Sequence, residues 1–260
     1  MISRYDRILL GYAATTAGLA GIYGSSIWTL GLPTLLLAAL TADGVARPSS
    51  SVFYPTMTHG PRSGDRVSLT FDDGPDPEVT PRVLDALGAV GAHATFFVIG
   101  RILESYPEIA KRIVSEGHEL GNHSFGHSRL QNFYGQRRTA EEIASGREII
   151  RRFAGPYVEP PFRPPVGLKN PSLARAALKQ NLLIAAWSLH SRDTRIRDPG
   201  KICARVLNGL RAGDIVLFHD GHDLPGRHRP GCAEALPAIL RGMGERGLRS
   251  VTVTELTRNG

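Results

Sequence analysis

Two adjacent acids follow a short apolar run in the segment LTFDDGPDP, residues 69–77. Neighbouring strand residues point to opposite faces and adjacent carboxylates repel each other, so a purely structural pair would gain little here. A bound cation would relieve that repulsion. Asp72 and Asp73 are therefore candidates for metal-assisted chemistry and for general acid–base catalysis.

Two histidines stand four residues apart in the segment HSFGH, residues 123–127. On a helical turn this spacing would place both imidazoles on one face, within reach of one ion. One carboxylate and two imidazoles form a three-ligand site with an open position for water, as a catalytic zinc requires. We expect Asp73, His123 and His127 to bind a divalent metal ion, with Zn²⁺ favoured over Co²⁺ and other divalent ions.

A carboxylate beside such a site can accept a proton from the attacking water, and Asp72 is the natural candidate. An ionised Asp72 gains from a cationic partner. Arg163, in the segment FRPPVG, offers a planar guanidinium that matches carboxylate geometry. The prolines around Arg163 restrict its backbone, which argues against an ordinary surface arginine.

A third histidine, His219, ends the apolar run IVLFH at residues 215–219. We expect it to protonate a leaving group that would otherwise depart as a poor amide anion. Asp193, in the segment WSLHSRDT, is expected to hold one ring nitrogen of His219 and so keep that ring protonated. Trp187 opens the same segment and either lines the pocket or packs in the core.

The elements that must position these residues alternate along the chain after residue 66. Short β-branched or aromatic runs predict strands, and apolar positions at helical spacing predict helices between them. The expected strands cover residues 67–71, 94–99, 118–121, 161–163, 182–189, 214–219 and 249–253. The expected helices cover residues 79–90, 107–115, 139–153, 171–180, 199–210 and 233–246.

This alternation predicts an α/β fold of parallel β-α units, which either close into a barrel or spread into a doubly wound sheet. In both arrangements the chemistry lies where strands end. The candidate residues occupy such places: Asp72, Asp73, His123, Arg163, Asp193 and His219. We therefore expect the fold to bring them to one rim.

Five segments in this order resemble the motifs of the polysaccharide deacetylase family, also called the NodB homology domain or carbohydrate esterase family 4. The resemblance covers about residues 67–255. It rests on TFDDGP (70–75), HSFGH (123–127), RPPVG (163–167), WSLHSRD (187–193) and LFH (217–219).

The resemblance implies a distorted seven-stranded β/α barrel that removes N- or O-acetyl groups from sugars with a divalent metal, usually zinc. It also implies a role for each matched residue. Asp72 would be the base oriented by Arg163, and His219 the acid tuned by Asp193. The metal ligands would be Asp73, His123 and His127.

The chain departs from the family's pattern in three places. The family usually has an aromatic residue where Val166 stands, and the backbone N–H there would help to hold the oxyanion, which valine still allows. His190 and Thr194 replace an aspartate and a tryptophan, so we expect a remodelled wall of the substrate groove. The segment at residues 219–231, rich in His, Gly and Arg, is expected either to contact substrate or to be an ordinary polar loop.

The N-terminal region has a different composition, because residues 8–42 contain no charged side chain. That run is long enough to enter a bilayer and longer than the apolar core of a signal peptide. We expect residues 1–46 to be a membrane anchor of one or two helical segments, residues 47–66 a linker and residues 67–260 the deacetylase domain. A buried helical hairpin is the alternative.

The arrangement of the anchor bears on the location of the domain. A single span would place the domain outside the cytoplasm, whereas a hairpin would keep both ends inside. Arginines flank both sides of the apolar run, so charge barely discriminates between the two. We favour an external domain, because the family mostly works on surface glycans.

The overall composition excludes some classes of partner. The net charge of +7 is dispersed, and no basic run with interleaved aromatics is present, which argues against nucleic-acid binding. Two cysteines are too few for a disulfide scaffold or a thiolate metal site. The expected partners are a glycan or amino-sugar substrate and membrane lipid.

The sequence thus predicts a membrane-anchored, metal-dependent hydrolase that removes acetyl groups from the N-acetylated sugars of a polysaccharide or glycan. One alternative is a deacetylase or deformylase of a lipid-linked amino sugar at the cytoplasmic face. A non-haem iron oxygenase also uses one carboxylate and two histidines, but it predicts a β-sandwich context and leaves Asp72 and His219 without a role. The last alternative is an inactive, membrane-anchored sugar-binding module.

Overall fold

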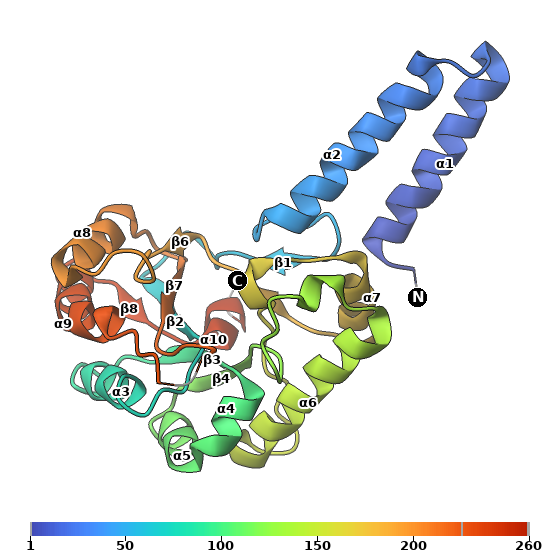
Figure 1. Cartoon of the computed structure of the whole chain (residues 1–260). Coiled ribbons are helices and arrows are strands. Elements are labelled where there is room, and N and C mark those ends of the chain that lie inside the picture. The colour runs from blue at the N-terminus through green and yellow to red at the C-terminus, as the bar shows by residue number, and fades with distance from the viewer. Residues whose placement is uncertain (1, 225, 259–260) are drawn as a thin grey trace.

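The structure is a computed structural model that describes residues 2–224 and 226–258. It consists of a helical hairpin and an α/β domain in which helices surround a parallel sheet (Figure 1). The helices are α1 (Arg4–Tyr23), a π-helical turn (Ile27–Gly31), α2 (Leu32–Ala46), α3 (Thr80–Gly88), α4 (Gly100–Ser105), α5 (Pro107–Ser115), α6 (Gln136–Ala154), α7 (Pro171–Gln180), α8 (Pro199–Gly209), α9 (Gly231–Gly244) and α10 (Val253–Arg258), with 3₁₀ turns at Gln131–Phe133 and Pro165–Gly167. The strands are β1 (Thr56–Met57), β2 (Arg66–Asp72), β3 (Ala94–Val98), β4 (Glu119–Asn122), β5 (Ile184–Ala185), β6 (Leu189–His190), β7 (Ile215–His219) and β8 (Arg249–Ser250).

The main sheet has six parallel strands in the order β4-β3-β2-β7-β6, with β8 also paired to β2. Its centre is apolar on both faces, as expected for a parallel sheet covered by helices. Phe71 of β2 stacks on Phe96 of β3 and on Phe218 of β7, with ring centroids 5.0 and 5.5 Å apart. These buried contacts fix the three central strands, whose carboxyl ends carry the candidate residues.

The pairing confirms the parallel α/β fold, and it is not the β-sandwich that the oxygenase alternative predicts. This pairing does not by itself close the sheet into a seven-stranded barrel. Within the described residues, β1 and β5 form a separate two-stranded pair. The expected strand at residues 161–163 is reduced to Phe162, which forms single bridges with Asn122 and Ile184.

The expected strand at residues 182–189 is divided into β5 and β6. The reason is a side chain that takes the backbone acceptors between them. Arg163 donates through Nε to the carbonyl of Ala185 at 3.2 Å and through Nη2 to the carbonyl of Ala186 at 2.9 Å. These two carbonyls therefore bind a guanidinium instead of a neighbouring strand, while the N–H of Ala186 still donates to the carbonyl of Met57 in β1 at 2.7 Å.

The two N-terminal helices lie side by side and project away from the α/β domain (Figure 1). Hydroxyl pairs join them at two levels, since Tyr5 Oη lies 2.8 Å from Thr41 Oγ1 and Tyr12 Oη lies 2.8 Å from Thr34 Oγ1. The hairpin turns after Gly24, which has a φ of 74°. Among the described residues, one helical stretch, 27–46, is long and apolar enough to cross a membrane, with a mean hydropathy of 1.5.

The base of the hairpin is held against the α/β domain. Asp6 of α1 accepts a hydrogen bond from Arg175 Nη2 of α7 at 2.6 Å. Tyr5 packs edge-on against Phe53, with ring centroids 4.8 Å apart. The domain thus fixes the first turn of α1, which a flexible connection would not do.

The segment expected as a linker, residues 47–66, also packs on the domain. It contributes β1, which pairs with β5. The buried ammonium group of Lys169 donates to the carbonyls of Pro48 and Ser50, each at 2.5 Å. Pro48 lies against Gly167, so this segment reaches the wall of the candidate site described next.

Candidate active site

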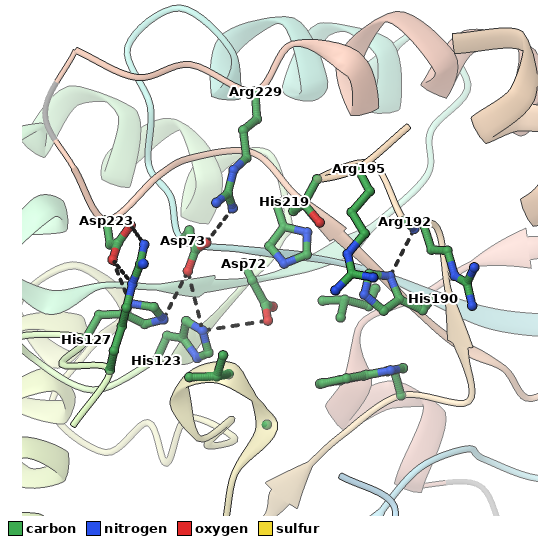
Figure 2. A pocket seen from close by; sticks show the side chains of 16 residues that line it. Asp72, Asp73, His123, His127, His190, Arg192, Arg195, His219, Asp223 and Arg229 are labelled. Atoms are coloured by element: carbon green, nitrogen blue, oxygen red, sulfur yellow. Dashed lines mark hydrogen bonds and ion pairs between the residues drawn. The ribbon is translucent and has the colours of Figure 1, made fainter. Parts of the chain in front are cut away.

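One cavity of about 510 Å³ lies at the carboxyl ends of the central strands. Its wall contains every predicted site residue except Arg163 and Asp193, which lie behind it. The predicted residues in the wall are Asp72, Asp73, His123, His127, Val166, Trp187 and His219. Residues far apart in the sequence thus share one pocket (Figure 2).

The proximity of Asp72 and His219 follows from strand register. The two residues are direct partners on the adjacent parallel strands β2 and β7. Asp72 Oδ1 accepts a hydrogen bond from Arg163 Nη1 at 2.6 Å, and its Oδ2 lies 3.7 Å from His123 Nε2. One oxygen of Asp72 is therefore fixed by a cation while the other faces the histidines.

Arg163 is fully buried, and its donors are held by several partners. Besides Asp72 and the carbonyls of Ala185 and Ala186, it donates to Thr70 Oγ1 at 2.8 Å. Its guanidinium carbon lies 3.9 Å from the centroid of the Phe97 ring. Burial lowers the pKa of Arg163, and the Asp72 charge opposes that shift. Arg163 holds the carboxylate of Asp72 in position. Removing either partner would leave the other as a buried charge without compensation.

Asp73, His123 and His127 form a compact cluster with the geometry of a metal site. Asp73 Oδ1 lies 3.1 Å from His127 Nε2 and 3.6 Å from His123 Nε2. The three ligand atoms all lie within 4.8 Å of one another. His123 Nδ1 lies 2.7 Å from the backbone oxygen of Arg163, which leaves Nε2 to face the cluster. Such an outer hydrogen bond is what orients a ligating imidazole.

The protonation of the cluster also suits a cation. Burial, and next the neighbouring His127, lower the pKa of His123 to about 3, so this ring is neutral at neutral pH, as a metal ligand must be. Both ring nitrogens of His127 are buried without a hydrogen-bond partner among the described residues. Buried polar atoms are rarely left unpaired, so the cluster fits a divalent ion.

The loop that carries the two histidines is irregular, and the helical turn expected from their spacing is wrong. Ser124 and His127 have φ values of 65° and 51°. The backbone N–H of His127 donates to Ser124 Oγ at 3.0 Å, which holds this tight turn. It brings the rings of His123 and His127 to a centroid separation of 4.7 Å. The two rings thus lie close together as predicted, but an irregular loop and not a helical turn brings them there.

His219 is held at two atoms by one carboxylate. Its backbone N–H donates to Asp193 Oδ2 at 2.7 Å, and its Nδ1 lies 2.9 Å from Asp193 Oδ1. Burial lowers the pKa of His219, but the charge and hydrogen bond of Asp193, together with Asp73 and Asp72, outweigh burial and raise it above the ordinary value. With Nδ1 engaged, Nε2 is the ring atom left to give a proton to a substrate.

Strained backbone is concentrated around the cavity. Six described residues other than glycine have a positive φ, and four of them line the pocket: Asp73, His127, Val166 and Arg192. Val166, with a φ of 55° and a side chain that is 60 % exposed, is the least expected of them, since β-branched residues avoid this region. Strain of this kind collects at functional sites.

Several residues of the pocket were not singled out by sequence analysis. Arg229 donates to Asp73 Oδ2 at 2.7 Å, so a guanidinium holds the oxygen that faces away from the histidines (Figure 2). Arg129 donates to Asp223, whose Oδ2 lies 4.0 Å from His127 Nδ1. Arg229 and Asp223 belong to the segment at residues 219–231, whose charged residues among Gly and Pro were the available signal.

The chain is similar to known carbohydrate deacetylases. A family model described as polysaccharide deacetylase matches residues 59–184. The chain is 36 % identical over 202 residues to a peptidoglycan-N-acetylglucosamine deacetylase of Bacillus cereus, which covers 76 % of this chain and 91 % of that protein. It is 38 % identical over 186 residues to a chitooligosaccharide deacetylase of a Bradyrhizobium species, covering 71 % and 83 % respectively.

The likeness extends to solved structures. A crystal structure of a peptidoglycan N-acetylglucosamine deacetylase in complex with 4-naphthalen-1-yl-N-oxidanyl-benzamide superimposes with a TM-score of 0.73 at 34 % sequence identity. The superposition covers 79 % of this chain and 94 % of that one.

Proposed function

The chain belongs to the polysaccharide deacetylase family of hydrolases, and we propose that it removes acetyl groups from the N-acetylated sugars of a bacterial glycan. The observation that carries the proposal is that one pocket contains both a candidate general base and a candidate general acid, each held by a charged partner. A carboxylate fixed by Arg163 and a histidine fixed by Asp193 stand at the same register of neighbouring strands. The relatives named for peptidoglycan and for chitooligosaccharides support this class of substrate.

In the proposed mechanism Asp72 is the general base. Its carboxylate accepts a proton from the water that attacks the acetyl carbonyl, and Arg163 keeps Asp72 ionised and oriented. The backbone N–H of Val166 donates to the carbonyl oxygen as negative charge develops on it. His219 then gives its proton to the sugar nitrogen as the carbon–nitrogen bond breaks, so that acetate and a free amino sugar leave.

Asp73, His123 and His127 would hold the divalent metal ion of this reaction, with zinc favoured by the His₂Asp donor set. When bound, such an ion lowers the pKa of water and polarises a carbonyl. Arg229 on Asp73 Oδ2 keeps Oδ1 turned toward the two imidazoles. Trp187 supplies an apolar wall against which a sugar ring can pack.

We also infer that the sheet and the β1–β5 pair belong to one distorted seven-stranded barrel. Support comes from Phe162, which bridges β4 and β5, and from the continuity of residues 184–190, which pair with Phe162 at one end and with β7 at the other. A curved, incomplete ring of this kind leaves room for the pocket at the carboxyl ends of its strands.

We further propose that the hairpin of α1 and α2 inserts into a membrane. The run at residues 8–42 is uncharged, and large apolar side chains such as Ile22, Trp28 and Leu35 are 67–75 % exposed. Exposed apolar surface of this extent marks an interaction site. Each arm, such as residues 8–23, would reach roughly 24 Å, most of a hydrocarbon core of about 30 Å.

The paired helices alter the expectation about location. The external domain was favoured because the family mostly works on surface glycans, and it requires a single span, whereas an inserted hairpin keeps Arg4 and the α/β domain on one side. That arrangement favours a second candidate, a deacetylase or deformylase of a lipid-linked amino sugar at the cytoplasmic face. Substrate comparison separates the two candidates.

The test is to offer the purified full chain three substrates: peptidoglycan, chitooligosaccharides and polyprenyl-linked N-acetyl sugars. Released acetate and the product masses are measured, with the formyl analogue of the lipid-linked sugar as a further arm. We expect acetate release that stops on chelation and returns with added zinc or cobalt. Full activity in protein shown to be metal-free, or no amide cleavage with any substrate, would overturn the proposal.

A further inference from the structure

The charges that line the catalytic pocket do not balance one another. Three aspartates face the cavity, and each has a cationic partner: Asp72 with Arg163, Asp73 with Arg229 and Asp223 with Arg129. Two more arginines, Arg192 and Arg195, line the same cavity. Their side chains form no hydrogen bond or ion pair with any described residue. The pocket thus has two guanidinium groups whose charge is not offset by direct contact with any group in residues 2–224 and 226–258.

The loop that carries these two arginines is fixed by its neighbours. Asp193, between them, binds His219 at two atoms. Arg192 has a φ of 62°, and its backbone N–H donates to His190 Nδ1 at 3.0 Å. The carbonyl of His190 accepts from Arg205 Nε at 2.8 Å. The backbone that holds Asp193 against the proposed acid therefore also sets the positions of both arginines.

The side chains differ in direction within this frame. Figure 2 shows Arg195 pointing into the pocket beside His190, while Arg192 extends from the outer part of the same wall. His190 lies between Trp187 and His219, with ring centroids 5.9 and 6.0 Å away. A group bound by the arginines would therefore lie on the His219 side of the cavity, beyond the atoms that react.

We propose that Arg192 and Arg195 form an anion-binding subsite, and that the substrate is an N-acetylated sugar carrying a phosphate or carboxylate group near the reacting amide. Guanidinium groups bind both anions through paired, charge-assisted hydrogen bonds. An uncompensated cationic wall also concentrates anionic substrates in the cleft. The inference rests on the proposed function, because it names the substrate class of that same reaction.

The kinetic test compares neutral and anionic substrates in the full-length protein. N,N′,N″-Triacetylchitotriose (chitotriose below) is the neutral probe, N-acetylglucosamine 1-phosphate carries a phosphate, and N-acetylmuramic acid carries a carboxylate. We expect the double variant Arg192→Gln/Arg195→Gln to raise KM for an anionic probe about ten- to hundred-fold more than for chitotriose, the usual effect of losing hydrogen bonds to a charged group. The preferred anion distinguishes a sugar phosphate from a sugar acid.

Arg197→Gln is the matched control, because Arg197 is exposed on the same loop and lies outside the pocket wall. We expect this variant to change neither KM value by more than about two-fold, the range of an ordinary surface substitution. Equal losses with neutral and anionic probes in the double variant, or an equal loss in Arg197→Gln, would overturn the subsite.

A binding measurement separates this inference from the proposed function. Titration calorimetry is carried out with N-acetylglucosamine and with its 1-phosphate, on the wild-type protein and on the double variant. If the wild-type protein binds the phosphate form more tightly and the double variant loses the preference, the subsite stands even if no substrate is deacetylated. If both sugars bind equally well to the wild-type protein, the subsite is wrong, whatever the protein hydrolyses.

Discussion

Asp72 and Asp73 are neighbours in the chain, yet their carboxylates are held by different arginines on different sides of the pocket. Asp72 Oδ1 binds Arg163, which is fully buried, and Asp73 Oδ2 binds Arg229, which belongs to the loop after β7. The free oxygen of Asp73 lies 3.1 Å from His127 Nε2. The positive φ of Asp73, 71°, turns its side chain away from the direction that a regular strand would give.

Substitutions at these two positions should therefore have different effects. Asp72→Asn should keep the metal and lower turnover by roughly 10²- to 10⁴-fold, the range for a positioned base. Asp73→Asn should lower metal affinity itself, because a neutral amide is a poorer ligand. Metal content by atomic emission and turnover are measured together. The control is Asp65→Asn, an exposed residue paired with Arg249, which should alter neither quantity. Metal loss in Asp72→Asn alone would reverse the two roles.

The alkaline limit of activity should depend on Asp193. His219 must be protonated to act as the acid, so activity falls as pH rises through its pKa, which Asp193 raises. Asp193→Asn removes that charge, lowers the pKa of His219 and should move the alkaline limb of the kcat profile to lower pH. Asp198→Asn, at the N-cap of α8 near the same loop, should leave the limb in place. If the alkaline limb of the kcat profile is unchanged in Asp193→Asn, Asp193 does not set the pKa of His219.

Val166 offers a test of backbone against side chain. Val166→Gly keeps the N–H and relieves the left-handed strain, so it should retain activity within a few-fold and raise the free energy of unfolding by up to about 1 kcal/mol. Val90→Gly is the control, since Val90 is 59 % exposed against 60 % for Val166 and has no positive φ. Glycine there should destabilise by roughly 0.4–1 kcal/mol, because it gives the unfolded chain more conformational freedom. Thermal unfolding and turnover are measured on the same preparations. A large loss of activity in Val166→Gly would show that the side chain of Val166, and not its backbone N–H alone, is needed for turnover.

Charge placed on the hairpin should weaken its membrane insertion. In a bilayer centre an acidic side chain costs roughly 2.5–3.5 kcal/mol. The double variant Leu35→Glu/Leu36→Glu should therefore move protein from the membrane pellet to the soluble fraction. Leu130→Glu, in the α/β domain, is the control, because Leu130 is 64 % exposed and Leu35 is 67 % exposed. Wild-type protein recovered entirely in the soluble fraction would contradict membrane insertion.

The two ends of the hairpin should share one side of the membrane. Protease added to intact spheroplasts should digest both an N-terminal tag and the α/β domain, or neither of them, and lysis should expose both. Complete protection would place the pocket at the cytoplasmic face and favour lipid-linked sugars. Digestion of only one of the two would show a single span and contradict insertion of α1 and α2 as a pair.

Sequence patterns predicted the regular helices well, because a buried face leaves a clear period. The helices expected at residues 107–115 and 171–180 agree with α5 and α7 at both ends. The short α4 was missed, since six residues are too few to show a period. The division of residues 182–189 was also missed, because it depends on Arg163, which is distant in the sequence and takes the backbone acceptors there.

The pocket was predictable as far as local sequence carried its chemistry. The acids and histidines at predicted strand ends indicated which side chains would lie close together. The strand register and the residues that line the cavity agree with that prediction. The spacing of His123 and His127 suggested a helical turn, whereas the actual loop depends on a positive φ at Ser124, which spacing does not encode. Arg229, Arg192 and Arg195 were missed because charged loop residues resemble ordinary solvated ones until the fold turns them toward a cavity.

The clamp of Lys169 on the segment before β1 changes how the enzyme would find its substrate. Because Lys169 binds the carbonyl of Pro48 and Pro48 packs against Gly167 in the pocket wall, packed chain and not a free tether connects the hairpin to the cavity. With the hairpin in a bilayer, the search for a membrane-bound sugar becomes lateral diffusion in two dimensions at a constant height. The enzyme would then act only on sugars that lie at the height of its pocket above the lipid. Glycan chains whose reactive unit lies nearer to the lipid or farther from it would not be deacetylated at any concentration.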